Sequence, residues 1–208
     1  NDILECDLDG TPQDPQGRRS YAERFIHGAI YRARPDVMAV VHSHSPAIIP
    51  FGVTGARLRP ICHMSGFLGS STPVFEIRHS AGEASDLLIS NQALGLALAN
   101  TLGQSSVALM RGHGSVAVGA PLRQVVYRAI YTESNARLQS EAMRFGEVNY
   151  LTDAEARSTA AMIDEPDPQN GSTITSPGSL NARKKNSGRP IGKAAAWPVA
   201  SWLPVNGG

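Results

Sequence analysis

The sequence predicts an α/β fold, in which short apolar strands alternate with helices. Two continuous apolar runs, at residues 37–41 and 107–110, have the length and composition of buried strands. Residues 20–34 instead place apolar side chains three and four positions apart, which is the period of an amphipathic helix. Glycine and proline separate such segments, so strands and helices alternate along the chain. The sequence alone does not give the order or direction of the strands.

The first half of the chain is expected to form four elements. They are a helix at 20–34, a strand at 37–44, a short helix at 46–51 and a short strand at 73–77. Phe25, Ala29 and Ala33 line one face of the first helix. Pro35 ends this helix, because proline cannot continue its hydrogen-bond ladder. The apolar run that opens the following strand indicates burial on both faces.

The second half is expected to form five elements. They are a helix at 84–102, strands at 107–110 and 116–118, and helices at 122–145 and 153–162. Gly103 and Gly146 follow two of these helices at the position where glycine commonly ends a helix. Residues 165–208 are rich in Pro, Gly, Ser, Asn and Lys and show no sustained period. We therefore expect one folded domain at 1–164 and a low-complexity tail, disordered or aberrant, at 165–208.

Composition argues against several classes of protein. A net charge of +1 over 208 residues gives no reason to expect nucleic acid or an anionic membrane as a partner. No apolar run approaches the roughly 20 residues that a membrane-spanning helix needs. Cys6 and Cys62 lie in unrelated contexts, so we expect no disulfide framework and a reducing cytoplasm. The first residues lack the pattern of a signal peptide and an initiator Met, and we expect that an N-terminal segment is missing.

Two histidines, His42 and His44, lie two positions apart where the first strand ends. Side chains at that spacing in a strand point to the same face, about 6.5 Å apart along the chain. Two imidazoles in this arrangement can bind one ion through metal–nitrogen bonds of about 2.1 Å. A hydrogen-bonded histidine pair at a strand end is the alternative, and this pattern alone does not exclude it.

Three further residues are candidates only in combination. His113 follows an apolar strand and lies between two glycines, which let the backbone turn sharply, although a turn with an incidental histidine is the alternative. Glu23 lies near the start of the first helix, where the helix dipole alone explains an acidic residue, and His27 shares its face. His63 is a weaker candidate, since an ordinary loop histidine explains it equally well.

In chain order, these residues resemble the class II aldolase/adducin family. The resemblance covers about residues 4–160 and rests on the ordered segments ERFIHGAIY at 23–31, RPD at 34–36, AVVHSH at 39–44 and GHG at 112–114. It implies a three-layer α/β/α sandwich on a mainly antiparallel sheet, and a homotetramer with sites at subunit interfaces. It also implies that His42, His44 and His113 bind a metal ion. Glu23 would be the catalytic carboxylate, which can also bind the metal when substrate is absent.

Departures from the sugar-phosphate aldolases of this family indicate another branch. Tyr21 and Ala22 stand where those aldolases hold a phosphate with small hydroxyl residues. Met64 stands where they carry a tyrosine proton donor, and methionine cannot donate a proton. The segments that resemble the branch decarboxylating hydroxylated phthalates and pyridine dicarboxylates are 63–69, 73–78, 109–114 and 127–131. The N-terminal pocket loops and the C-terminal helix of the family have no counterpart in the sequence.

The resemblance therefore implies a metal-dependent carbon–carbon lyase. The expected reaction is decarboxylation of a hydroxylated aromatic or heteroaromatic carboxylic acid through a metal-stabilised enolate. One divalent ion per subunit is expected, Zn²⁺ or Mn²⁺, and Co²⁺ also suits three imidazoles and a carboxylate. Arg111, as a bidentate fork, and His63 would bind this small-molecule carboxylate, although a structural ion pair is the alternative for Arg111. An aldolase or epimerase of a sugar or sugar phosphate, and a non-catalytic adducin-like interaction module, stay open as alternatives.

Overall fold

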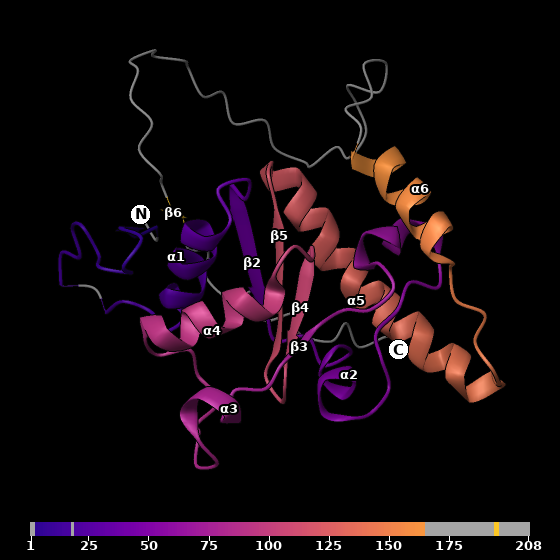
Figure 1. Cartoon of the computed structure of the whole chain (residues 1–208). Coiled ribbons are helices and arrows are strands. Elements are labelled where there is room, and N and C mark those ends of the chain that lie inside the picture. Colours follow the sequence, from indigo (N-terminus) through magenta and orange to yellow (C-terminus); the bar gives the residue numbers. More distant parts are fainter. Residues whose placement is uncertain (1–2, 18, 165–193, 196–208) are drawn as a thin grey trace, which may run out of the picture.

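The computed structural model describes residues 3–17, 19–164 and 194–195. A four-stranded sheet lies at its centre, with the strand order β2–β5–β4–β3 (Figure 1). These strands are β2 (Ala39–Ser43), β5 (Gly114–Gly119), β4 (Val107–Met110) and β3 (Val74–Phe75). β5 pairs antiparallel with both β2 and β4, whereas β3 pairs parallel with β4. The sheet is therefore mainly antiparallel, as the resemblance implies.

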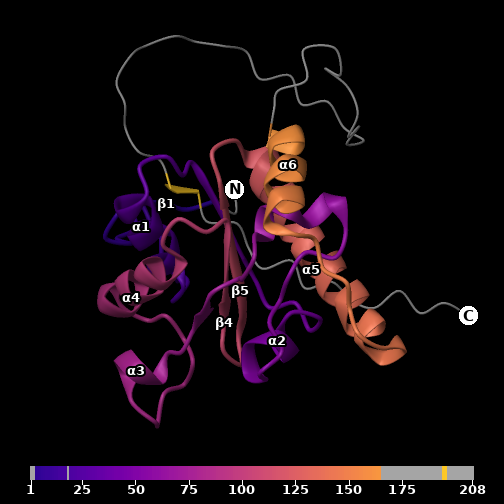
Figure 2. The same cartoon turned by 45° about the vertical axis from the view of Figure 1, so that its right-hand side comes forward.

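Helices cover both faces of this sheet, which is clearest where it is seen on edge (Figure 2). One face carries α1 (Arg24–Ala33) and α4 (Gln92–Leu102). The other face carries α2 (Ile49–Val53), the 3₁₀ helix η1 (His63–Leu68) and α5 (Leu122–Phe145). The helix α3 (Arg78–Ala81) precedes α4, and α6 (Asp153–Asp164) packs on η1. The expected three-layer α/β/α sandwich is confirmed.

The alternation of side chains along the strands produces two apolar cores. Val40 of β2 and Val116 of β5 belong to the core shared with α1 and α4. Ala39 and Ala117, one position away on the same strands, belong to the core shared with α2 and α5. Even-numbered residues of β2 therefore face α1, and His42 points into that layer.

Three helix starts correct the sequence predictions. α2 begins at Ile49 rather than at residue 46 and ends at Val53 rather than at residue 51. α1 begins at Arg24 rather than at residue 20, because residues 21–23 form a turn. α4 begins at Gln92 rather than at residue 84. The Asn91 side chain caps this helix by accepting a hydrogen bond from the Leu94 amide at 3.0 Å, and residues 82–91 form a loop. β4 and α5, by contrast, have the predicted bounds.

Short elements outside the main sheet were not predicted. β1 (Glu5–Cys6) pairs antiparallel with β6 (Ala194–Ala195). The rest of the expected tail at 165–208 lies outside the described residues. Cys6 and Cys62 are free thiols. No helix within the described ranges has the length and apolarity that crossing a bilayer requires.

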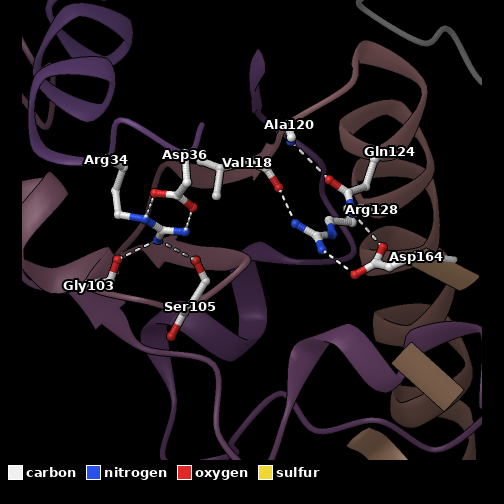
Figure 3. A network of polar contacts seen from close by, with 9 residues as sticks. All are labelled: Arg34, Asp36, Gly103, Ser105, Val118, Ala120, Gln124, Arg128 and Asp164. Atoms are coloured by element: carbon white, nitrogen blue, oxygen red, sulfur yellow. Dashed lines mark hydrogen bonds and ion pairs between the residues drawn. The ribbon is translucent and has the colours of Figure 1, made fainter. Parts of the chain in front are cut away.

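Polar contacts connect helices and loops at the end of the sheet where β2 and β4 begin (Figure 3). Arg34, which ends α1, pairs with Asp36 at 2.7 Å and donates to two backbone carbonyls just after α4. Arg128 of α5 donates to the carbonyl oxygen of Val118 at 2.7 Å and pairs with Asp164 of α6 at 2.9 Å. The opposite end, where β2 stops and β4 turns into β5, carries the candidate site.

Candidate metal centre

Four side chains with metal-binding atoms converge at that end of the sheet. They are Glu23, His42, His44 and His113, and one ligand atom from each lies within 4.8 Å of all the others. We call these four residues the His/Glu cluster. The end of β2, the turn between β4 and β5, and the start of α1 supply them. Residues far apart in the sequence thus meet because the sheet pairs β2 with β5.

The two histidines of the HxH motif lie at the end of β2. His42 belongs to the strand, and His44 is the first residue after the strand ends. The Nδ1–H of His42 donates to the carbonyl oxygen of Ser115 on β5 at 3.0 Å, because a carbonyl can only accept. Its Nε2 faces the cluster and lies 2.8 Å from Nε2 of His44. The side chain of His42 is 4% exposed and that of His44 is 40% exposed, so the cluster opens to solvent beside His44.

His113 closes the turn between β4 and β5. Gly112, directly before it, has a φ of +65°, in the left-handed region that favours glycine. A Cβ on Gly114, directly after it, would collide with the backbone carbonyl oxygen at the end of β2. The Nδ1–H of His113 donates to the carbonyl oxygen of Leu87 at 2.7 Å, and its Nε2 lies 2.8 Å from Nε2 of His44. Both glycines are therefore needed for this histidine to reach the cluster.

Glu23 is the N-cap residue of α1 rather than a member of its first turn, and its carboxylate is buried. Its Oε1 lies 2.8 Å from Nε2 of His113 and 3.3 Å from Nε2 of His42. Its Oε2 lies 3.8 Å from Nε2 of His44. Burial by itself raises the pKa of Glu23, but contact with His113 and His42 outweighs it and holds the pKa well below its usual range. Glu23 is therefore a carboxylate at neutral pH.

His44 and His27 are neutral at pH 7. Burial and the neighbouring rings of His42 and His113 lower the pKa of His44, so its lone pair is available to a metal. His27 lies one turn beyond Glu23 on α1, and burial lowers its pKa to about 4. Its Nδ1 has no hydrogen-bond partner within the described ranges. His27 therefore adds no positive charge beside the cluster.

The donor set fits a divalent cation. Ligand atoms that bind one cation at about 2.1 Å, and at about 90–110° to one another, lie about 3.0–3.4 Å apart. Five distances between cluster atoms are 2.8–3.8 Å, around these values, and all the ligand atoms lie within 4.8 Å of one another. Oε1 of Glu23 is buried and has no hydrogen-bond partner within the described ranges, although Nε2 of His113 lies 2.8 Å away. One cation would satisfy the carboxylate and the three lone pairs together.

The structure places the other two predicted residues outside this cluster. Arg111 pairs through Nε with both carboxylate oxygens of Glu76, at 2.8 and 2.7 Å. The structural ion pair that was the alternative for Arg111 is therefore present. Glu76 also pairs with Arg78 at 2.7 Å. His63 is the first residue of η1 and is exposed. A role in substrate binding stays a prediction for Arg111 and His63.

Sequence reasoning missed the groups that orient the histidines. The acceptors for His42 and His113 are the backbone carbonyls of Ser115 and Leu87. A backbone acceptor leaves no mark on residue identity, so no motif reveals it. Sequence reasoning also missed Glu76 as the partner of Arg111. Glu76 lies in the strand predicted at 73–77, and a carboxylate in a neighbouring strand is a reasonable candidate to pair with an arginine.

Two hollows lie away from the cluster. One, of about 460 Å³, is bordered by residues between 80 and 94 beside α4, and the other, of about 310 Å³, lies among η1, α5 and α6. None of the four cluster residues lines either hollow. The chemistry of the donor set, and not a cavity, therefore identifies the candidate site.

The chain is similar in sequence to a known protein family and to proteins named as decarboxylases. Residues 1–140 match the sequence profile described as Class II Aldolase and Adducin N-terminal domain. Decarboxylase tropJ of Talaromyces stipitatus is 45% identical over 145 residues, which are 65% of this chain and 54% of that protein. The 3,4-dihydroxyphthalate decarboxylase of Terrabacter sp. is 28% identical over 160 residues, which are 74% of this chain and 63% of that protein. The chain thus spans little more than half the length of these two relatives.

A solved structure shows the same fold. L-fuculose 1-phosphate aldolase superposes with a TM-score of 0.66 at 22% sequence identity, and the match covers 79% of this chain and 73% of that one. At this level of identity the similarity concerns the arrangement of helices and strands, and it does not extend to the substrate.

Proposed function

The chain belongs to the class II aldolase and adducin family, and on that premise we propose that it is a divalent-metal-dependent lyase that breaks a carbon–carbon bond. We propose further that it decarboxylates a hydroxylated aromatic or heteroaromatic carboxylic acid. The similar proteins named as decarboxylases support this branch. The observation that carries the proposal is the His/Glu cluster, in which three imidazole nitrogens and one buried carboxylate face one another.

His42, His44 and His113 would hold the cation through Nε2, with Glu23 beside them. When bound, a Zn²⁺, Mn²⁺ or Co²⁺ ion supplies a Lewis acid that stabilises negative charge on a substrate oxygen. The hydrogen bonds from Nδ1 of His42 and His113 keep these two rings aligned. The exposed side of His44 leaves room for a substrate to approach.

Glu23 is our candidate for proton transfer. Loss of carbon dioxide leaves an electron pair on the substrate carbon, and this carbon must take up one proton. Glu23 is the only carboxyl group of the cluster, and its position at the N-cap of α1 places it against both buried histidines. Because Glu23 is a carboxylate at neutral pH, it would first take a proton from water or from the substrate hydroxyl. It would then deliver this proton to that carbon as a general acid and become a carboxylate again.

Arg111 and His63 are proposed to bind the substrate. Glu76 occupies Nε of Arg111, and no residue in the described ranges pairs with its two Nη groups. A guanidinium held in this way can still offer Nη donors to a substrate carboxylate. Arg111 lies in the same turn as His113, which supports a place close to the cation. For His63, exposure at the start of η1 is the supporting observation.

Metal analysis and a substrate screen test this function. We expect about one divalent ion per chain after incubation with Zn²⁺, Mn²⁺ or Co²⁺, and release of carbon dioxide from hydroxylated benzoates, phthalates or pyridine carboxylates. Release of an aldehyde from sugars or sugar phosphates would instead identify an aldolase. A protein that binds none of the three ions would contradict the proposal and favour the non-catalytic, adducin-like alternative.

We also propose that residues 1–164 form the catalytic domain and that it assembles as a homotetramer. An apolar row on α5 supports self-association, because its side chains are 42–53% exposed and lie four or eight residues apart along the helix. The members of this row are Leu122, Val126, Ile130 and Leu138. Light scattering measures the mass in solution, and a monomer at micromolar concentration would contradict the tetramer.

A further inference from the structure

Leu87 has a backbone conformation that leucine rarely adopts. Its φ is +67°, in the left-handed region, where the Cβ atom crowds the backbone. Within the described ranges one other non-glycine residue, Gln16, also has a positive φ, of +44°, and it lies in an exposed N-terminal segment. A strained backbone of this kind persists only where its surroundings enforce it, and it often marks a functional site.

Local contacts hold Leu87 in this conformation. The Ser85 hydroxyl oxygen accepts a hydrogen bond from the Leu87 amide at 3.1 Å. The Asp86 carboxylate accepts one from the Leu88 amide at 3.0 Å. Ile89, which is fully buried, anchors the segment, and the Leu87 side chain packs against the same core. The loop therefore has a defined shape although it belongs to no helix or strand.

This shape directs the carbonyl oxygen of Leu87 at the His/Glu cluster. The oxygen accepts the Nδ1–H of His113 at 2.7 Å, compared with 3.0 Å for the bond from His42 to Ser115. The two acceptors differ in what holds them. Strand pairing fixes the carbonyl of Ser115 in β5, whereas the carbonyl of Leu87 depends on the loop alone. A hydrogen bond at Nδ1 fixes the tautomer and the direction of the ring, and hence where Nε2 points.

Gly112 completes the arrangement on the other side of the hydrogen bond. Its φ of +65° sets the direction in which the chain enters His113. A Cβ on Gly112 would lie 3.4 Å from Cδ1 of Leu87, so the two left-handed residues are close neighbours. One of them precedes the donor and the other carries the acceptor.

We propose that Leu87 is a positioning residue of the metal centre. Its left-handed backbone presents the carbonyl oxygen that holds His113 in the tautomer and orientation that bind a divalent cation. The inference rests on the proposed function, because it presupposes a cation at the cluster. It follows that the affinity for the cation depends on the φ angle at position 87 more than on the leucine side chain.

Two substitutions separate the backbone from the side chain. Leu87→Asn retains access to a positive φ, which asparagine tolerates well, but removes the apolar packing. Leu87→Ile retains the apolar volume, but a β-branched residue is strongly disfavoured at a positive φ. Gln16→Ile is the matched control, since it imposes the same backbone penalty at an exposed position outside the cluster. Leu87→Ala, in which the penalty at a positive φ is milder than for a β-branched residue, replaces Leu87→Ile if the isoleucine variant does not fold.

The effect of each substitution is read from the dissociation constant for Zn²⁺. It is measured on the full 208-residue chain by competition with a chromophoric chelator. We expect Leu87→Ile to raise it about 10- to 100-fold, as loss of an outer partner of a metal-binding histidine does, and Leu87→Asn and Gln16→Ile to stay within about 3-fold of wild type. Nuclear magnetic resonance of the Zn²⁺-loaded protein should show the Nδ1–H signal of His113 protected in Leu87→Asn and lost in Leu87→Ile.

Opposite outcomes separate this inference from the proposed function. Wild-type affinity in Leu87→Ile, or weak binding by Leu87→Asn beside intact binding by Leu87→Ile, would overturn the positioning role while the metal site itself stands. A wild-type protein that binds no Zn²⁺, Mn²⁺ or Co²⁺ would instead overturn the proposed function. Thermal unfolding of the metal-free variants verifies that each is folded.

Discussion

Two carboxylates, Glu23 and Glu76, lie at the same end of the sheet, and nitrogen atoms surround both. Glu76 accepts hydrogen bonds from the guanidinium groups of Arg78 and Arg111 and from the Arg78 amide, and these hold its pKa well below the usual range. Glu23 faces the Nε2 atoms of imidazoles, and the two buried rings direct their protons away from it, to backbone carbonyls. The first arrangement is complete as an ion pair, whereas the second could hold a cation. The two carboxylates therefore differ in the groups that they face, which are guanidinium N–H donors for Glu76 and imidazole Nε2 atoms for Glu23.

Removal of a histidine from the Glu23 arrangement should have the largest effect. His113→Ala deletes the nitrogen closest to Oε1 of Glu23. We expect bound metal and decarboxylase activity to disappear together, with a loss of affinity beyond the roughly 10- to 100-fold that an outer partner contributes. Elemental analysis after dialysis measures the effect. His79→Ala, at an exposed histidine of α3 outside the cluster, is the control and should keep its metal. Full occupancy in His113→Ala would refute the assignment.

Acid should destabilise the region around Glu23, because it protonates the buried His27. Burial lowers the pKa of His27 from 6.5 to about 4, so the folded protein binds this proton less readily than the unfolded chain. The free energy of unfolding should be highest above pH 6.5 and fall by up to about 3 kcal/mol as the pH drops towards 4. Urea unfolding of metal-free protein between these pH values measures the slope. His27→Gln should have a shallower slope, and an unchanged slope would contradict the buried, neutral state of His27.

Removal of the charge on Glu23 tests whether its missing partner is a cation. Glu23→Gln retains the shape of the side chain, and we expect cation affinity to fall about 10- to 100-fold. The metal-free protein should lose some thermal stability as well, because the contacts with His113 and His42 that hold the pKa of Glu23 below its usual range are lost with the charge. An unchanged cation affinity in Glu23→Gln would show that Glu23 does not bind the metal, and the contrast with Glu76 would fail.

The matched change at the other carboxylate should have the smallest effect on metal binding. Glu76→Gln weakens partly exposed ion pairs with Arg78 and Arg111, which contribute little to stability. We expect a slightly lower unfolding midpoint and a cation affinity equal to that of wild type, measured in the same chelator competition. An affinity loss as large as that of Glu23→Gln would show that the Arg111 ion pair supports the metal centre.

The sequence predicted elements best where local signals agree. The apolar run at 107–110 and the segment 122–145 before Gly146 gave β4 and α5 at their observed bounds. The predicted start of α4 was wrong, because the apolar residues at 87–89 continue the helical pattern, whereas the Asn91 cap decides where the helix begins. Strand order was out of reach, since pairing depends on residues far apart in the chain. It was the resemblance that supplied the three-layer architecture.

The members of the candidate site could be selected from the sequence, but their geometry could not. His42 and His44 stood out by spacing, and His113 by its flanking glycines, while Glu23 became a candidate only through the order of the motifs. The structure brings the four together, and their roles in binding and catalysis remain predictions. The role of the Leu87 carbonyl as a hydrogen-bond acceptor could not be predicted, because leucine gives no sequence signal for a left-handed backbone.

The alignment of β2 with β5 has a consequence for folding. His42 stands opposite Val116, and Ser43 opposite Ser115. A slip of one residue between these strands would turn His42 towards α5, away from Glu23, because neighbouring side chains in a strand point to opposite faces. An ion bridging His42 and His113 would bind only the correctly paired chain and so favour it over misaligned forms. The metal would then select the correct strand pairing during folding, in addition to any role in catalysis.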